Sequence, residues 1–584
     1  MSLLEALRYL FGLAPREGLF TLVFLLLGSA IPALAAWVAK LLIDGIVAQR
    51  PLVEVFTLLS LELGLLLLAG VLQQAGTYFQ ERLRNRVSMR LRLELAAKRA
   101  SQDMADLESQ EGSLAFSRVW AESRLRPVLM VVYGVQLLIN LVAGLAFAVA
   151  ILLLRADLLL AVVLTLLPAL WVARRGSALV FGALVDSSRE GHLMELFEEY
   201  LTRLEHAKEV RLYRLQPWFL GEARRLAQTR LERLNQAALG QVVSHGAGQT
   251  LLLLAQYASL GYGLWLTLGG QLSLGGFTLL VVGLAQVRQN FQGLLGNYTE
   301  LRENLLFLQD FLSYQERPAR IELPSPEETL PLPVGSSLRL EGVWFSYPGT
   351  ARPVLAGLDL ELPPNTTTAL VGENGAGKTT LVKLLLRLYD PDQGRIQLSG
   401  VDIRTLPLDS YRRNFTVVPQ DFLRLGLSLG EQVAMHQGYD PHRVQEALAQ
   451  MRLSGVLERL PEGLRTPLSR ELGGVDLSGG EWQRTALARV LYHKTPMVIL
   501  DEPTAALDPE AEAEILDEFG RLLPGRLALI ITHRLASVRF ADRIAVLKEG
   551  RIVELGTHAE LMAERGIYAR MYRRQLEQYR WEGA

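Results

Sequence analysis

The chain has 584 residues, no cysteine and a formal net charge of −1, and hydrophobic residues make up 50% of it. The absence of cysteine excludes disulfides, thiolate metal sites and a cysteine nucleophile. The near-neutral charge gives no electrostatic basis for binding nucleic acid.

The apolar excess is concentrated in the first half of the chain, whereas the second half alternates short strand-like and helix-like segments. We therefore predict a membrane domain over residues 1–317 and a soluble domain over residues 338–584. The segment between them, 318–337, contains five prolines. Because proline disrupts both helix and sheet hydrogen bonding, we predict a linker there.

A short amphipathic helix is predicted at the amino terminus. Its apolar residues recur at helical spacing, namely Leu3, Ala6, Leu7, Leu10 and Phe11. Such a helix lies in the membrane surface or packs on protein. The apolar run that follows, 19–36, could be taken for a cleavable signal, but apolar sequence continues to Val47 and further spans follow. We predict that it is the first membrane helix.

Runs long enough to cross roughly 30 Å of hydrocarbon predict six membrane helices. They lie near residues 18–43, 55–77, 128–154, 156–178, 246–268 and 274–297. The loops after the first, third and fifth spans are short and poor in cations, whereas the other connections are long and basic. The positive-inside rule therefore places both termini and the soluble domain in the cytoplasm.

The long cytoplasmic connections are predicted to be helical. The first of them has no proline over 52–126, and apolar residues recur every fourth position from Val87 to Leu95. Two short breaks, 106–112 and 207–213, fall at the tips of helical pairs. They are either solvated hairpins or contacts that transmit force to the soluble domain.

Polar residues within the predicted spans are candidates for a polar path through the membrane, because an ionisable group in hydrocarbon normally faces a cavity or a partner. They are Glu62, Asn140, Gln256, Gln286, Arg288, Gln289 and Asn290. Hydrogen bonding between helices is the alternative role for each of them.

The segment 372–380 reads GENGAGKTT and follows the apolar run 366–371. It fits the phosphate-binding pattern G-x-x-x-x-G-K-[ST], in which backbone N–H groups and a helix N-terminus surround phosphate oxygens. Lys378 would reach the terminal phosphates, and Thr379 would bind Mg²⁺. The predicted nucleotide-binding residues here are Gly372, Asn374, Gly375, Ala376, Gly377, Lys378, Thr379 and Thr380.

A second helix N-terminus with small residues and a hydroxyl follows at 477–481, before an alanine-rich segment. It could also bind phosphate. The residues concerned are Ser478, Gly479, Gly480 and Glu481.

Two further strand ends carry candidate catalytic groups. The apolar run 496–500 leads into Asp501 and Glu502. Asp501 would hold Mg²⁺, and Glu502 would act as the general base that polarises the attacking water. His533 follows the apolar strand 527–532, where it can contact the γ-phosphate of a nucleotide.

With these motifs in this order, residues 338–570 resemble the cassette of the ATP-binding cassette transporter family. The whole chain resembles an exporter-type half-transporter. The resemblance implies a six-span α-helical domain followed by an α/β P-loop NTPase cassette, with a RecA-like core and antiparallel β and helical subdomains. It also implies that the second motif, called the signature, completes the nucleotide site of an opposite cassette. The partner would then be a second half-transporter; a homodimer is favoured over a heterodimer, and whether the partner is an identical or a related chain stays open.

The resemblance assigns further roles by position. Tyr347 would stack on adenine, Gln420 would sense Mg²⁺ and meet the membrane domain, and Asp508 would communicate between the two sites. The breaks at 106–112 and 207–213 take the places of the coupling helices. ATP and Mg²⁺ are the implied cofactors.

Three departures from the family pattern leave the coupling between subunits open. The signature ends in Glu481 rather than the commoner glutamine, Ala505 replaces a frequent serine, and 468–474 lacks the usual Val-Gly-Glu-Arg-Gly wording. None of them removes a catalytic group.

The expected function is ATP-driven export across the cytoplasmic membrane by alternating access. A flippase for lipids or lipid-linked sugars is an alternative within transport. A nucleotide-gated channel or sensor is an alternative outside it, and an intact Glu502 argues against this one. The segment 473–480 also faintly resembles exporters of small modified peptides. The substrate therefore stays open.

Overall fold

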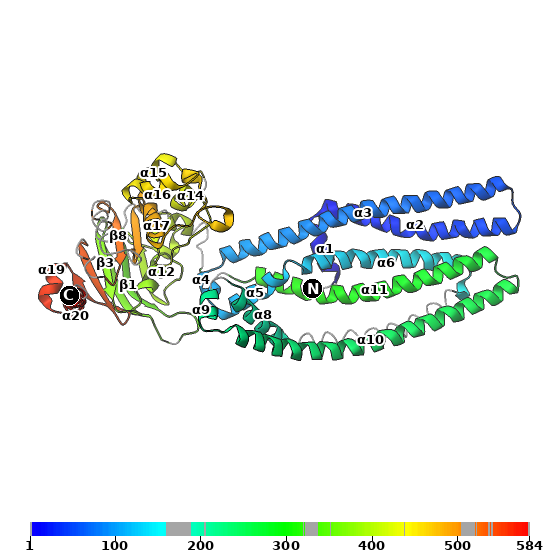
Figure 1. Cartoon of the computed structure of the whole chain (residues 1–584), viewed down its shortest axis with the longest axis horizontal. Helices are drawn as coiled ribbons and strands as arrows, with labels where there is room; N and C mark the ends of the chain where they lie inside the picture. Colours follow the sequence, from blue (N-terminus) through cyan, green and yellow to red (C-terminus); the bar gives the residue numbers. More distant parts are fainter. Residues whose placement is uncertain are drawn as a thin grey trace. The chain divides into compact units, whose positions relative to one another are not determined.

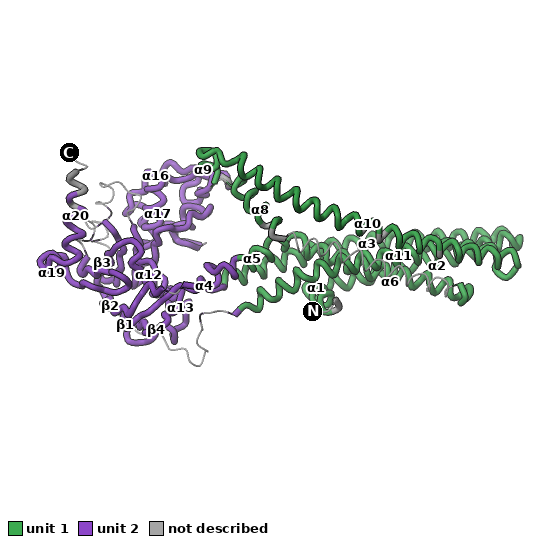
Figure 2. Tube along the Cα trace, turned by 90° about the horizontal axis from the view of Figure 1, so that it is seen from below, with its two compact units in different colours: residues 1–101, 114–317 green, residues 102–113, 318–584 purple. Residues whose placement is uncertain are grey.

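The protein is described by a computed structural model that divides into two compact units (Figure 2). The membrane unit comprises Met1–Ser101 and Leu114–Arg317, and the nucleotide unit comprises Gln102–Ser113 and Pro318–Ala584. Apart from a few isolated positions, the described residues are 3–158, 188–203, 206–318, 337–350, 352–436, 438–503, 523–534 and 541–581.

Long helices build the membrane unit (Figure 1). The described helices before the linker are α1 (Leu3–Leu13), α2 (Pro15–Val47), α3 (Leu52–Ser101), α4 (Met104–Leu107), α5 (Gln110–Glu122), α6 (Arg126–Leu154), α8 (Ser188–Thr202), α9 (Ala207–Leu212), α10 (Gln216–Leu268) and α11 (Leu274–Gln315). Helix α2 packs on α3, α6 packs on α11, and α8 packs on α10. Proline occupies the first turn of α2, α6 and α10, where its missing N–H leaves no helical bond unmade.

Helix α3 continues without interruption for 50 residues, which corresponds to about 75 Å at 1.5 Å per residue. Val87, Leu91 and Leu95 are fully buried along its C-terminal part, so the predicted helical extension of the second span is confirmed. Leu7 and Leu10 of α1 are buried in the same core. The amphipathic helix at the amino terminus therefore packs on protein.

The predicted count of six membrane spans is not confirmed. Within the described part of the chain, four helices are long and apolar enough to cross a membrane: α2, α3, α6 and residues Gly246–Leu268 of α10. Most of the predicted fourth span, 156–178, lies outside the described residues. The predicted sixth span, 274–297, is helical within α11 but is not among the four, because the polar run from Gln286 to Asn290 interrupts its apolar sequence.

Two sheets form the framework of the nucleotide unit. A four-stranded antiparallel sheet has the order β2-β1-β4-β5, and a six-stranded sheet has the order β10-β9-β3-β8-β7-β6. The strands are β1 (Leu338–Phe345), β2 (Leu355–Leu362), β3 (Thr367–Gly372), β4 (Gln393–Leu398), β5 (Val401–Asp402), β6 (Phe415–Val418), β7 (Met497–Asp501), β8 (Leu527–Ile531), β9 (Arg543–Lys548) and β10 (Arg551–Gly556). In the larger sheet all neighbouring strands are parallel except β10 and β9. The carboxyl ends of β3, β7 and β8 therefore meet at one edge, where sheets of this kind bind ligands.

Helices accompany both sheets (Figure 1). Those described are α12 (Lys378–Leu385), α13 (Leu408–Arg412), α14 (Leu429–Ala434), α15 (Pro441–Gln450), α16 (Ser454–Arg459), α17 (Gly479–His493), α19 (His558–Glu564) and α20 (Ile567–Trp581), with short 3₁₀ helices η1 (Ile403–Thr405), η2 (Gly463–Arg465) and η3 (Arg470–Leu472). Side chains of α14, α15 and α17 share one apolar core with β6 and β7.

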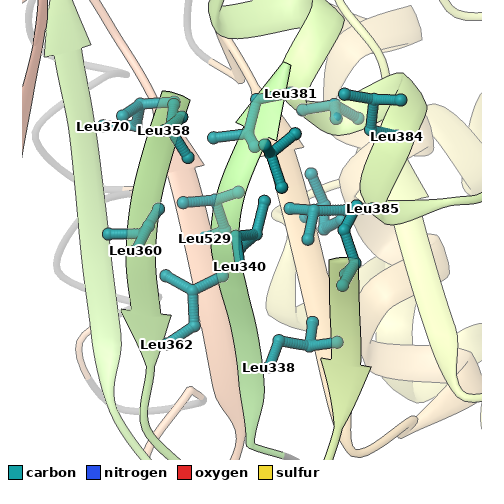
Figure 3. Close-up of a cluster of buried hydrophobic side chains, with 14 of the residues drawn as sticks. Leu338, Leu340, Leu358, Leu360, Leu362, Leu370, Leu381, Leu384, Leu385 and Leu529 are labelled. Atoms are coloured by element: carbon teal, nitrogen blue, oxygen red, sulfur yellow. The ribbon is translucent and has the colours of Figure 1, made fainter. Parts of the chain in front are cut away.

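A leucine-rich core joins the two sheets to α12 (Figure 3). Leu340 of β1 and Leu529 of β8 belong to it, as do Leu381 and Leu385 of α12, and each is at most 1% exposed. Ala105 of α4 is buried in the same core. Because α12 is fixed by this packing, its first residues are held at the carboxyl end of β3.

Candidate nucleotide site

The phosphate loop connects β3 to α12, in the strand–loop–helix context predicted from the sequence. Strand β3 is buried along its whole length between β9 and β8, and α12 begins at Lys378. Gly375 and Gly377 have φ angles of +79° and +104°, which residues with a Cβ rarely adopt. A Cβ on Gly377 would also lie 2.8 Å from the Leu355 side chain. The tight turn therefore requires these glycines.

A cavity of about 660 Å³ lies at this loop and at the carboxyl ends of β7 and β8. Its lining residues are Tyr347, Val354, Asn374, Gly375, Gly377, Lys378, Thr379, Thr380, Gln420, Asp501, Glu502 and His533. All of them except Val354 were predicted as site residues. Gly372 and Ala376 shape the loop without lining the cavity; a Cβ on Gly372 would lie 2.3 Å from the carbonyl oxygen of Leu547.

The amine of Lys378 is held inside the loop. Its Nζ donates hydrogen bonds to the carbonyl oxygens of Gly372 (2.9 Å) and Glu373 (3.0 Å). Burial lowers the pKa of Lys378, while attraction to Glu502 and Asp501 works in the opposite direction. Phosphate oxygens carry more charge than carbonyl oxygens, so a bound nucleotide would be a stronger acceptor for this amine.

Asp501, the last residue of β7, is only 4% exposed. Burial raises its pKa, and repulsion from Glu502 raises it further, to about 6, although a hydrogen bond with Thr379 lowers it. A cation beside these groups would relieve the repulsion.

The oxygens at this position fit Mg²⁺. Its common sites use one or two carboxylates together with substrate phosphates, so the lack of any cluster of three acidic or histidine residues in the described part of the chain is no obstacle. Asp501 and the hydroxyl of Thr379 would hold the ion, with Gln420 beside them. When bound, Mg²⁺ would neutralise charge on the phosphates.

Glu502 is fixed by two other candidate residues. Its Oε2 accepts a hydrogen bond from Nε2 of Gln420 (2.9 Å), and its Oε1 lies 2.9 Å from Nδ1 of His533. Its φ angle is +49°, an uncommon conformation for a residue other than glycine. The backbone N–H of Glu502 bonds to the carbonyl of Ile531 at the end of β8. This turn directs the carboxylate into the cavity rather than into the sheet.

The signature residues begin α17 but do not line the cavity. Ser478 caps the helix, and its hydroxyl oxygen accepts the N–H of Glu481, whose Oε2 accepts the N–H of Ser478 in return. The other carboxylate oxygen of Glu481 accepts a hydrogen bond from Arg459 (2.5 Å). The glutamate that replaces the commoner glutamine is thus neutralised by a neighbouring cation. Gly479 and Gly480 form the first turn of the helix.

Tyr347 lines the cavity and belongs to an aromatic cluster. Its ring meets Tyr389 edge to face, with centroids 5.6 Å apart, and Nζ of Lys383 lies 5.1 Å from its ring centroid. Sequence motifs do not point to Lys383 or Tyr389, because neither residue lies in a nucleotide-binding motif. Asp508 and Ala505 lie outside the described residues.

The structure separates the seven polar candidates of the membrane unit into three groups. Asn140 of α6 and Asn290 of α11 are buried, and each lies close to a glycine of the facing helix, which favours a packing role. Nε of Arg288 donates to Oε1 of Gln256 (2.8 Å) and so links α11 to α10.

The remaining three differ in exposure. Gln289 is exposed, whereas Glu62 and Gln286 are half-buried. They are not brought into the pair formed by Arg288 and Gln256.

Replacing Asp501 with asparagine is expected to stabilise the nucleotide-free protein at neutral pH. The pKa of this carboxyl rises from an ordinary value of 3.8 to about 6 in the folded protein. Folding therefore favours the protonated form, and this contribution to stability is complete below about pH 4 and lost as the pH rises through about 6. The shift corresponds to roughly 3 kcal/mol at most. Melting curves at about pH 4.5 and pH 7.5 should show a clearly larger advantage of the variant at the higher pH.

Asp402 provides a control of opposite sign. Burial raises the pKa of Asp402, but hydrogen bonds from Arg404 outweigh burial, and the net pKa is lowered. Asp402→Asn should therefore lower the melting temperature at neutral pH, and the loss should shrink only as the pH falls below the ordinary value of the carboxyl and through its lowered pKa. Equal destabilisation by both variants at neutral pH would contradict the unfavourable burial of charge at Asp501.

The chain is similar to several known proteins. A sequence model of the family described as ABC transporter matches residues 355–505. A protein of Bordetella avium (strain 197N), named ATP-dependent lipid A-core flippase, is 29% identical over 583 residues, which cover 96% of this chain and 95% of that protein. A protein of the same name from Polaromonas sp. is 44% identical over 39% of this chain and 38% of its own length. One from Thiobacillus denitrificans is 35% identical over 52% of each.

A solved structure extends the likeness to the whole fold. Its title reads "Structure of a bacterial Atm1-family ABC exporter with ATP bound", and it aligns with a TM-score of 0.83 over 96% of this chain and 98% of its own. The two sequences are 24% identical. The match therefore shows a shared fold, with a helical membrane region and a nucleotide-binding unit.

Proposed function

We propose that this chain moves an amphipathic lipid out of the cytoplasmic leaflet by alternating access. The chain belongs to the ATP-binding cassette transporter family, as an exporter-type half-transporter in which an ATPase cassette is fused to a membrane domain. One observation carries the ATP-driven part of the proposal. Lys378, Asp501, Glu502 and His533 all line one cavity of a chain that also has four helices able to cross a membrane in its described residues.

Two identical chains would work together. Within one chain the N-terminus of α17 lies outside the cavity that holds Lys378, although its capped first turn has the geometry of a phosphate site. In the proposed homodimer, Ser478 of each chain faces the nucleotide held by the other. Arg459 neutralises Glu481, so the carboxylate would not repel that nucleotide.

The cassette dimer closes when ATP lies between the two chains and opens after hydrolysis. Nucleotide can drive this change because it binds the closed state more tightly than the open one. The protein would lie in the cytoplasmic membrane, with both termini and the cassettes in the cytoplasm, as the distribution of basic connections favours.

Two observations support an anionic lipid as the cargo. Relatives matching most or part of the chain are named lipid A-core flippases. In the membrane unit, the guanidinium of Arg288 is half-buried and bonded to Gln256 between α11 and α10. A cation held among apolar helices suits a phosphate-bearing headgroup, because charge-assisted hydrogen bonds and apolar contact can act together.

Arg288→Ala is expected to weaken the response to anionic lipid without removing basal ATP hydrolysis. Loss of one charge-assisted contact corresponds to about a tenfold increase in the lipid concentration for half-maximal stimulation. The measurement is ATPase rate of the chain reconstituted in liposomes, titrated with a phosphorylated glycolipid, a zwitterionic lipid, a lipophilic cation or a peptide. Dithionite quenching of a fluorescent lipid in the same vesicles reports movement between leaflets.

Arg302→Ala is the matched control, since Arg302 is an exposed cation of the same helix outside the predicted span. It should leave the lipid response within about twofold of the unmodified protein, because an exposed charge contributes little. Stimulation by peptides or lipophilic cations alone would reject the lipid cargo while leaving ATP-driven export intact. Brisk hydrolysis without movement of any cargo would reject export itself.

A further inference from the structure

Residues Gln102–Ser113 belong to the nucleotide unit although they follow the long membrane-unit helix α3 in the chain (Figure 2). Within this segment Ala105 is buried in the leucine-rich core. The carboxylate of Asp103 accepts the backbone N–H of Ile321 (2.9 Å). An apolar contact of Ala105 and a hydrogen bond of Asp103 therefore both attach the segment to the rest of the nucleotide unit.

Glu108 places a carboxylate from this segment on helix α12 of the phosphate loop. Its Oε1 accepts a hydrogen bond from Nζ of Lys383 (2.8 Å), and its Oε2 accepts one from the hydroxyl of Tyr389 (2.5 Å). Burial opposes charge on both members of the ion pair. The hydrogen bonds outweigh it, so the pKa of Glu108 is lowered and that of Lys383 is raised. The pair is charged at neutral pH.

Lys383 connects this carboxylate to the nucleotide cavity. Its ammonium lies 5.1 Å from the ring centroid of Tyr347 and 5.7 Å from that of Tyr389, within the range of cation–π attraction. The hydroxyl of Tyr347 lies 3.1 Å from Oγ1 of Thr380, one turn before Lys383 in α12. Two contacts therefore fix the Tyr347 ring, one between its hydroxyl and Thr380 and one with the ammonium of Lys383, which Glu108 holds in place.

We infer that Glu108 is a positioning residue for recognition of the nucleotide base: it holds Lys383 against Tyr347 and so sets the affinity of the cavity for the adenine ring. The inference rests on the proposed stacking of adenine on Tyr347. A lysine side chain has many rotamers, and without a partner its ammonium leaves the ring for water. By thermodynamic reciprocity, adenine binding tightens the seating of 102–113 by the same factor that Glu108 adds to adenine affinity.

The test is equilibrium binding of ADP, which is not hydrolysed, to the purified full chain. Glu108→Gln should weaken ADP binding about three- to tenfold, the range of one cation–π contact, and leave the affinity for pyrophosphate unchanged. Lys383→Met should weaken ADP binding to a similar degree. The double variant should be no weaker than Lys383→Met, since both changes break one chain of contacts.

One variant background and one control variant make the result decisive. In Tyr347→Leu the effect of Glu108→Gln on ADP should vanish; an effect that persists there would overturn the inference. Equal weakening of ADP and pyrophosphate would also overturn it, because a general loss of structure or charge acts on both ligands. Glu341→Gln, which breaks an ion pair with Arg395 on the sheet away from the cavity lining, should leave both affinities unchanged. If Tyr347→Leu alone does not weaken ADP binding, the stacking assignment fails and the inference fails with it, whereas ATP-driven export would still stand.

Discussion

Glu502→Gln should reduce steady-state ATP hydrolysis at least about 100-fold, the lower end of what a general base contributes. The amide keeps the shape of the side chain, so the neighbours Gln420 and His533, both near 2.9 Å from the carboxylate oxygens, can stay in place. What is lost is the ability to take a proton from the attacking water. ATP binding should persist, and the variant should accumulate as an ATP-bound closed dimer.

The measurement combines phosphate release with size analysis of the full chain in detergent, with and without ATP. Glu373→Gln is the matched control, because Glu373 is an exposed carboxylate of the phosphate loop whose side chain does not line the cavity. Its hydrolysis rate should stay within about twofold of the unmodified protein. Rapid turnover by Glu502→Gln would reject the assigned base, and failure to bind ATP would mean that the substitution damaged the site itself.

The nucleotide site could be predicted from the sequence because each of its parts is a short contiguous pattern. A buried strand followed by glycines and Lys378 specifies a loop and a helix within nine residues. Strands ending in Asp501 or His533 specify the same edge of a parallel sheet. Each pattern predicts its own local structure, and the parallel order of the strands then places the strand ends next to one another.

Contacts between distant segments could not be read in this way. Glu108 and Lys383 are 275 positions apart, and the sequence around either residue does not indicate that the two are in contact. The break at 106–112 is predicted at the tip of a helical pair, but its place in the nucleotide unit depends on three-dimensional packing around Ala105. The order of polar and apolar residues also does not predict the left-handed backbone conformation of Glu502.

The predicted sixth span shows a different limit. Hydropathy averages a whole window, whereas a helix needs to be apolar only where it meets lipid. Arg288 donates a hydrogen bond to Gln256 of α10. Its guanidinium therefore lowers the mean hydropathy of the window, although it has a hydrogen-bond partner within the membrane unit.

Lys378→Met should remove most ATP binding by the nucleotide unit. The amine is only 8% exposed and bonds two carbonyl oxygens of the loop. A methionine fills a similar volume but leaves those carbonyls without a donor and the phosphates without a cation. Charge-assisted hydrogen bonds contribute about 1.5–3 kcal/mol each, so we expect an affinity loss of at least about 30-fold.

Thermal melting with and without ATP separates this effect from damage to the fold. Ligand that binds only the folded state raises stability in proportion to the logarithm of its concentration over Kd. The unmodified protein should therefore melt at a higher temperature with ATP, and Lys378→Met should show almost no shift at the same concentration. Lys548→Met, at an exposed cation at the end of β9, should retain the full shift. If Lys378→Met kept that shift, the amine would have no part in holding the phosphates, and the bonds to Gly372 and Glu373 would be its whole role.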